Sequence, residues 1–183
     1  MLIIPGFLIS LVTFPGVVVH EFAHERLCAR YDVPVAEVCY FRLGNPAGYV
    51  LHEEPDRYRD AFAVSVAPFL VNTLIALALF GVLALLWGKP DASGFHVDRF
   101  GIAGYALLWL GASVAMHAFP STGDAKNIWA RTKSEWREHP VVLLALPAVL
   151  VIYLANLLSI FWLDAIYALG LLLVALLSVG MLH

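Results

Sequence analysis

The sequence contains few charged residues and almost no cysteine. Only 14% of its 183 residues are charged, and its two cysteines are Cys28 and Cys39. Two cysteines exclude a disulfide framework, and theirs is not the spacing of a zinc ribbon. The formal net charge is -3 and basic residues form no stripe, which argues against nucleic acid as a partner. Soluble domains are about 25% charged, so this composition does not suit a chain surrounded by water alone.

The chain contains long apolar runs. Hydrophobic residues make up 61% of the chain, and the mean hydropathy is +0.82. Five runs are near the roughly 20 residues that a helix needs to cross a bilayer: 2–19, 61–87, 100–119, 141–158 and 161–182. No internal repeat divides the chain. We therefore expect residues 1–183 to form a single domain, an all-α integral membrane protein with about five transmembrane helices in the cell membrane.

Two hairpins are expected between or within these runs. Segments 36–42 and 48–52 flank the turn signal Gly44-Asn45-Pro46, and they predict a small β-hairpin after the first span. The last two apolar runs are joined by only a few residues near Asn156, which predicts a C-terminal helical hairpin over 141–182, as two full spans or as one re-entrant pair.

The basic residues predict an orientation. In a five-span arrangement only Lys89 and Arg99 fall on one side of the membrane, and the positive-inside rule makes the other side cytoplasmic. The cytoplasmic set is Arg26, Arg30, Arg42, Arg57, Arg59, Lys126, Arg131, Lys133 and Arg137. The polar ends of the first and third spans then meet near the cytoplasmic side, with the amino terminus outside and the carboxyl terminus inside.

The residues with the clearest chemistry are His20-Glu21-Phe22-Ala23-His24, an HExxH motif on a predicted helix. Histidines four positions apart lie on one helical face, where both imidazoles can bind one zinc ion. Glu21 is displaced around the helix, within reach of a water at the metal, as a general base must be. The motif predicts a catalytic Zn²⁺ site with His20 and His24 as ligands.

Catalytic zinc usually has a third protein ligand. Asp124 is the best candidate, because it follows the third span after Pro120 and Gly123, which break the helix and let backbone line a cavity. The alternative is that Asp124 only caps a polar helix beginning near Ala125. His117, seven residues upstream, is the rival ligand.

These motifs resemble the site-2 protease family of intramembrane zinc metalloproteases. That family carries HExxH on one core transmembrane helix and an aspartate ligand on a later one. His20, Glu21 and His24 match the first motif fully. Asp124 matches the aspartate, and Pro120 stands where the family has a proline.

The resemblance covers a motif core of roughly residues 5–130 and departs from the family pattern in the second motif. The usual Leu-Asp-Gly is replaced by Gly123-Asp124-Ala125, and His117 stands near the usual asparagine. The final segment 141–182 matches no family motif.

The resemblance also implies roles for the hairpin and for Asn72. In the family, a hairpin after the first motif helix offers an edge to an extended substrate, which segment 36–52 resembles. Residues 67–72, Ala-Pro-Phe-Leu-Val-Asn, are similar to a family Gly-Pro-x-x-Asn element. Asn72 then orients substrate or stabilises the developing oxyanion. An interhelical hydrogen bond is the alternative role.

The expected function is therefore zinc-dependent hydrolysis of a peptide bond in or near a membrane-spanning segment of a partner protein, within the lipid bilayer. A catalytically inactive metal-binding scaffold or chaperone is the alternative, although it has no need of Glu21. A membrane di-iron oxidase requires clustered histidine boxes, whereas the seven histidines here are scattered.

Overall fold

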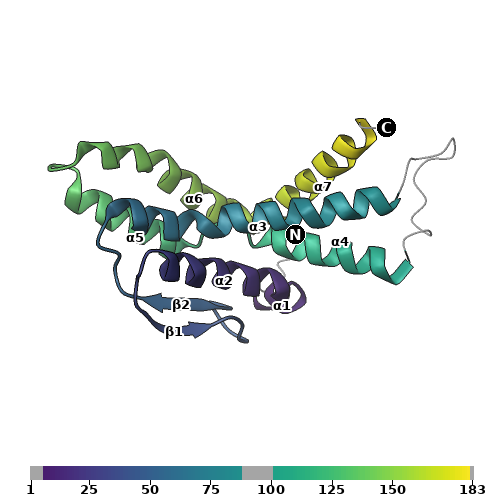
Figure 1. The fold of residues 1–183 in the computed structure, drawn as a ribbon, viewed down its shortest axis with the longest axis horizontal. Helices are drawn as coiled ribbons and strands as arrows, with labels where there is room; N and C mark the ends of the chain where they lie inside the picture. The colour runs from purple at the N-terminus through teal and green to yellow at the C-terminus, as the bar shows by residue number, and fades with distance from the viewer. Residues whose placement is uncertain (1–5, 88–100, 182–183) are drawn as a thin grey trace.

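The computed structural model describes residues 6–87 and 101–181, and these are mostly helical (Figure 1). In chain order the elements are α1 (Gly6–Val12), α2 (Phe14–Arg30), β1 (Val35–Cys39), β2 (Tyr49–His52), α3 (Tyr58–Trp87), α4 (Gly101–Met116), α5 (Thr122–Glu135), the 3₁₀ helix η2 (Pro140–Ala145), α6 (Leu146–Leu158), the 3₁₀ helix η3 (Ser159–Phe161) and α7 (Leu163–Met181). The all-α fold with one small hairpin is confirmed.

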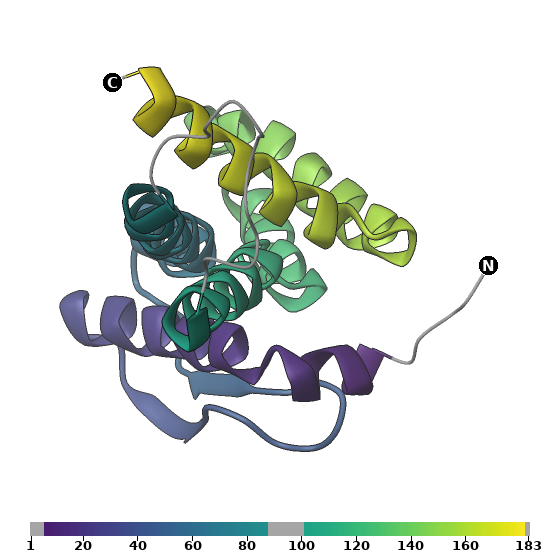
Figure 2. The ribbon, with the colours of Figure 1, turned by 90° about the vertical axis from the view of Figure 1, so that its right-hand side faces the viewer.

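The core is a bundle of α2, α3 and α4, with α7 packed on α3 and α4. Viewed from the end of the long axis, these helices surround a shared interior (Figure 2). Phe80 and Leu83 of α3 meet Val114 and Ala115 of α4 there, all almost fully buried. Large aliphatic side chains cover much of the outer surface, as a bilayer requires.

Helices α2 and α4 cross in close contact. A Cβ atom on Gly16 would lie 2.0 Å from the carbonyl oxygen of Ser113, so only glycine fits. The backbone N–H of Gly16 donates to Ser113 Oγ at 2.9 Å, and Ser113 Oγ donates to the Thr13 carbonyl at 2.8 Å. This contact fixes α2 one helical turn before His20.

The first apolar run is not one straight helix. It breaks at Thr13, and α1 and α2 meet at 88°. Pro15 lies in the first turn of α2, where its missing N–H leaves no hydrogen bond unmade. Sequence reasoning treated the run from residue 2 into the HExxH helix as continuous, and it overlooked Pro15 as a helix start signal.

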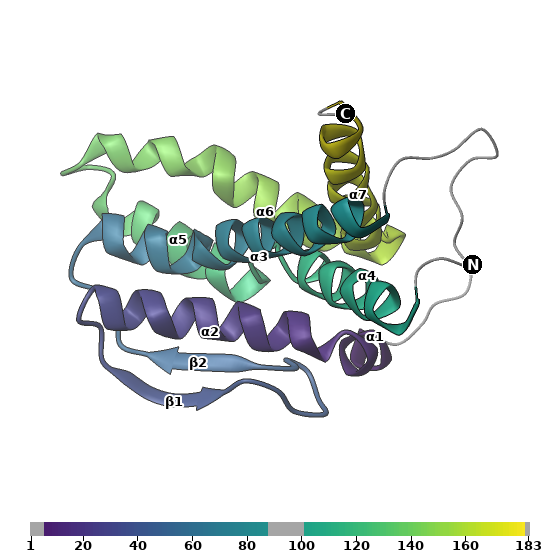
Figure 3. The same ribbon diagram turned by 45° about the vertical axis from the view of Figure 1, so that its right-hand side comes forward.

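The β-hairpin is confirmed. Strands β1 and β2 pair antiparallel, from Val35 opposite His52 to Cys39 opposite Tyr49, with an irregularity between Val35 and Glu37. The strands are shorter than the predicted segments. Figure 3 shows the hairpin lying along α2, with its turn beside α1.

Three helices within the described residues are long and apolar enough to cross a membrane: Tyr58–Leu86, Pro140–Phe161 and Leu163–Gly180. The bent pair of α1 and α2 makes a fourth if it counts as one span, and α4, with 16 residues, is shorter. The membrane character of the chain is supported by length and composition, while the count of about five spans stays a prediction.

Helices α6 and α7 do not pair as the expected antiparallel hairpin. Helix α6 packs on α5, whereas α7 packs on α3 and α4. Figure 1 shows the two helices following one another along the long axis. Between them the chain turns through η3 and through Trp162, whose φ is 65°. The connection was short enough for a hairpin, but the two helices have different packing partners.

Candidate metal centre

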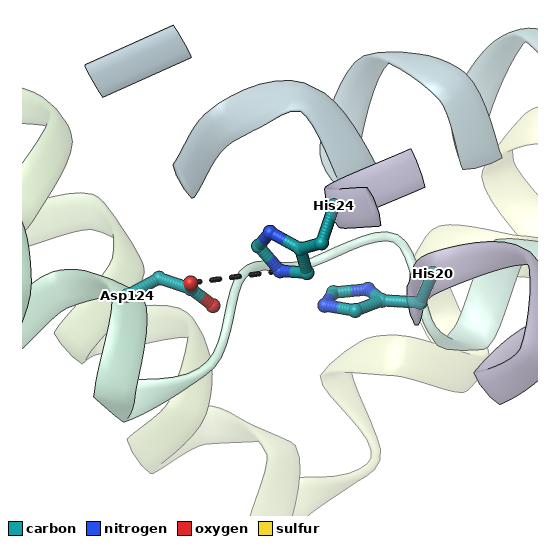
Figure 4. Close-up of side chains that lie close together, drawn as sticks. All are labelled: His20, His24 and Asp124. Atoms are coloured by element: carbon teal, nitrogen blue, oxygen red, sulfur yellow. Dashed lines mark ion pairs between the residues drawn. The ribbon is translucent and has the colours of Figure 1, made fainter. Parts of the chain in front are cut away.

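His20 and His24 project from one face of α2 toward Asp124 (Figure 4). The i, i+4 spacing brings the two rings together, with centroids 5.0 Å apart. Both side chains are buried, with 8% and 7% of the residue surface exposed. Two buried imidazoles on one face are the arrangement that half of a two-histidine metal site requires.

Asp124 both caps α5 and faces the histidines. Its Oδ2 accepts hydrogen bonds from the backbone N–H and the hydroxyl of Ser121, both at 2.7 Å. The Ser121 hydroxyl accepts in turn from the Asp124 N–H, which completes a capping box. Oδ1 remains available and lies 3.5 Å from His24 Nε2. The two roles considered from sequence are therefore compatible, since each uses a different oxygen.

The charge state of Asp124 suits a ligand. Burial acts to raise the pKa of this carboxyl, but the hydrogen bond and the charge of His24 outweigh burial and lower the pKa to about 2. The carboxylate is therefore ionised across the physiological pH range, as metal binding requires.

The three side chains fit one metal ion. Among the described residues, His20, His24 and Asp124 form a group whose ligand atoms all lie within 4.8 Å of one another. Ligands about 2.0–2.1 Å from tetrahedral zinc are separated by about 3.4 Å, close to the 3.5 Å between His24 and Asp124. Two imidazoles and one carboxylate are a donor set that zinc accepts. The rival His117 is not part of this group.

His117 contributes its backbone instead of its ring. Helix α4 ends at Met116, so the carbonyl of His117 is free to accept. His20 Nδ1–H donates to that carbonyl at 2.7 Å, which leaves His20 Nε2 unprotonated and able to bind metal. The ring of His117 turns back, with Nδ1 3.1 Å from the Ser113 carbonyl.

Asn72 supports the same carbonyl from α3. Its Nδ2 donates to the carbonyls of Gly16, Val114 and His117 at 3.3, 3.2 and 3.0 Å. The side chain is fully buried and does not line the cavity beside the histidines. This is the interhelical hydrogen bonding named as its alternative role, and through His117 it also holds His20. A direct catalytic role for Asn72 stays a prediction.

A cavity of about 410 Å³, here called the central cavity, opens beside the three ligands and contains Glu21. Glu21 is 8% exposed and follows His20 on α2. Gly48 of the hairpin packs directly against it, because a Cβ there would lie 2.7 Å from Glu21 Cγ. Tyr49, Val50 and the side chain of His52 continue the wall along β2. The cavity thus places a carboxylate, two imidazoles and a strand side by side.

Part of the lining comes from residues that sequence reasoning did not assign to the site. Asn156, Ser159 and Asp164, from the end of α6 to the start of α7, line the central cavity. Asn156 Nδ2 donates to the Pro120 carbonyl at 2.9 Å and to the Ile152 carbonyl at 2.8 Å. It therefore fixes the turn that precedes Asp124. The sequence signal that could have identified these residues is that polar side chains occur within or beside apolar runs.

Comparisons of the chain with models of protein families, with curated proteins and with solved structures find no match. The interpretation of the site therefore depends on its own geometry and on its sequence motif.

Proposed function

We propose that this chain is a zinc-dependent intramembrane endopeptidase that hydrolyses a peptide bond in or near a membrane-spanning segment of a partner protein. The observation that carries the proposal is the convergence of His20, His24 and Asp124, with Glu21 in the same cavity. A metal site that only supports the fold needs no further carboxylate, whereas hydrolysis needs a base.

Each residue of the site has a defined task in this reaction. His20, His24 and Asp124 would hold zinc, which would supply Lewis acidity for the hydrolysis. The Glu21 carboxylate accepts the proton of the attacking water and returns it to the amine nitrogen that leaves. Burial of these groups strengthens the electrostatic interactions between them.

The shape of the central cavity favours an extended peptide as substrate. Strand β2 pairs with β1 on one side, and its residues Tyr49, Val50 and His52 line the cavity. An extended peptide can add to the other edge of β2 through main-chain hydrogen bonds. A helical segment offers no free backbone groups there, so the substrate must be unwound at the bond that is cleaved.

We further propose a multi-pass position in the cell membrane, with the site near the cytoplasmic side. The support is the nine-to-two division of Lys and Arg together with the fold. Figure 1 has the carboxyl end of α2, the amino end of α3 and helix α5 at the same end of the molecule. Cysteine labelling of intact cells tests this: segment 121–139 should react only from inside and segment 89–99 only from outside.

The relation to the site-2 protease family is part of the same proposal. Its support is the HExxH motif, the later aspartate and the hairpin between them, all of which contribute to one cavity. The resemblance is confined to these features.

The decisive experiment compares Glu21→Gln with Asp124→Asn in purified protein, by zinc content and by cleavage of a panel of single-span substrates. Glutamine keeps the volume of Glu21 but cannot accept a proton, so this variant should retain zinc and lose nearly all hydrolysis. Asp124→Asn should lose zinc and activity together, because an amide is a poorer ligand. Full activity in Glu21→Gln would sink the mechanism. A wild-type protein that binds zinc but cleaves no substrate is the result that a scaffold predicts.

A further inference from the structure

A second depression, here called the outer groove, lies between α1 and the turn of the β-hairpin. Its volume is about 630 Å³. One wall is Gly6, Phe7 and Ser10 of α1, and the other is formed by residues 43–45 and 47 of the turn. Figure 3 shows these two segments side by side, at one end of α2.

The outer groove adjoins the central cavity. Ser10, Asn45 and Ala47 line both. An elongated ligand at the candidate metal ligands would pass these three residues to reach the outer groove. The described lining of the outer groove comes from α1 and the turn.

The outer groove is mostly apolar. None of its described lining residues carries a charge, and its polar members are Ser10 and Asn45. The two large apolar side chains that line it are well exposed, Phe7 at 51% and Leu43 at 72%. The nearby Arg42 is engaged by the hairpin itself, since its Nε donates to the Pro46 carbonyl and its guanidinium lies over Tyr49. Such a surface binds apolar groups and rejects charged ones.

We propose that the outer groove is a substrate subsite, which binds the uncharged, apolar flank of an extended segment whose scissile bond lies at the metal centre. The occupant follows from the shared lining residues: whatever fills the outer groove and reaches the metal must be elongated, and its outer part must match an uncharged wall. This inference depends on the proposed function and adds a specificity to it, against charge on one side of the cleaved bond.

Gly44 offers a way to fill the outer groove without disturbing the fold. A Cβ on Gly44 would meet only Arg42 Nε at 3.8 Å and the Pro46 carbonyl oxygen at 4.0 Å, and its φ is not positive. Because Gly44 lines the groove and its position accepts a Cβ, Gly44→Phe adds a large side chain to this wall. The matched control is Gly81→Phe on α3, where a Cβ meets nothing within 4 Å.

The test uses hydroxamates, which bind zinc, with zinc-loaded protein in detergent micelles. Acetohydroxamate is compared with hydroxamates that carry a four-residue Ala-Leu-Phe-Leu tail on one side or the other. A further set carries the same tails with Lys in place of Phe. Dissociation constants are measured by titration calorimetry. On one side the apolar tail should improve affinity by about tenfold or more, as burial of one large side chain does. The gain should vanish in Gly44→Phe, remain in Gly81→Phe and be absent for the Lys tails.

The outcomes separate the subsite from the metal centre. If acetohydroxamate binds but neither apolar tail improves affinity, the outer subsite is disproved and the metal centre stands. A gain that survives in Gly44→Phe, or that a Lys tail matches, also overturns the subsite. If acetohydroxamate itself does not bind zinc-loaded protein, the metal centre is wrong and the subsite falls with it.

Discussion

The crossing of α2, α3 and α4 and the outer faces of α6 and α7 differ in what their side chains contact. At the crossing, Gly16, Asn72 and Ser113 are linked by hydrogen bonds through the interior. Along α6 and α7 large side chains such as Leu154 and Leu173 are about half exposed. Apolar surface gives helices in a bilayer no preference for one another over lipid. The helix that carries His20 and His24 is therefore positioned by specific hydrogen bonds and close backbone contact, whereas the outer faces of α6 and α7 present apolar side chains that select no neighbour.

The two regions meet at the central cavity. The described polar side chains near the junction of α6 and α7, Asn156, Ser159 and Asp164, all line it. Asn156 reaches across to the turn before Asp124. Variants in the crossing should thus disturb the site strongly, and variants near the junction should disturb it weakly.

The largest effect is expected from the ligands themselves. Wild-type protein should hold about one zinc per chain, and His20→Ala or His24→Ala should hold almost none, measured by metal analysis. His139→Ala is the control, since His139 is exposed and distant in sequence from the motif. Normal zinc content in both ligand variants would remove the basis for assigning a metal to this crossing.

Gly16→Ala should have the next largest effect. Its new Cβ would lie 2.0 Å from a backbone oxygen of α4, so the helices must separate. We expect a loss of about 3 kcal/mol in the free energy of unfolding, the upper range for overpacking. Thermal unfolding in detergent measures it. Gly81→Ala on the open face of α3 is the control and should be neutral or slightly stabilising, since alanine favours helix. Equal stability of the two variants would contradict the close crossing.

Asn72→Ala should weaken both the fold and the metal site. It removes three hydrogen bonds, which costs about 2 kcal/mol of stability, and it frees the carbonyl that orients His20. Zinc affinity should fall by about tenfold, as for other groups that orient ligands. The control is Thr73→Val, which removes hydrogen bonds to the Phe69 carbonyl and the Tyr167 hydroxyl. Thr73 itself does not line the central cavity. The control should lower stability and leave zinc affinity unchanged. If Thr73→Val lowered zinc affinity as much as Asn72→Ala does, Asn72 would be a purely structural residue.

Asn156→Ala should have the smallest effect. The amide acts on Asp124 only through the Pro120 carbonyl, so zinc affinity should fall by about threefold, less than the roughly tenfold typical of direct contacts with a ligand. Competition with a chelator measures this. Leu150→Ala on the exposed face of α6 should leave zinc affinity unchanged. A loss in Asn156→Ala as large as in Asn72→Ala would show that α6 and α7 hold the site as firmly as the crossing does.

Local features were predictable from the sequence, and long-range packing was not. The hairpin follows from its turn residues, and the shared face of His20 and His24 follows from helix geometry. The break at Thr13 had a local signal in Pro15. The separate partners of α6 and α7 had none, because uniformly apolar helices carry little information about which neighbour they pack against.

The sequence alone determined that the chain is apolar and helical, and that two histidines and Glu21 share one helix, because composition and i, i+4 spacing are local properties. Only the tertiary structure shows that Asp124, and not the ring of His117, lies with His20 and His24 in one group of side chains that could hold a metal. His117 and Asp124 follow the same helix, and from sequence only Pro120 and Gly123, which lie between them, favoured Asp124. The end of α4 turns the His117 carbonyl toward His20, while the capping box of α5 occupies one oxygen of Asp124 and aims the other at His24. That choice depends on how three helices meet, which no local pattern encodes.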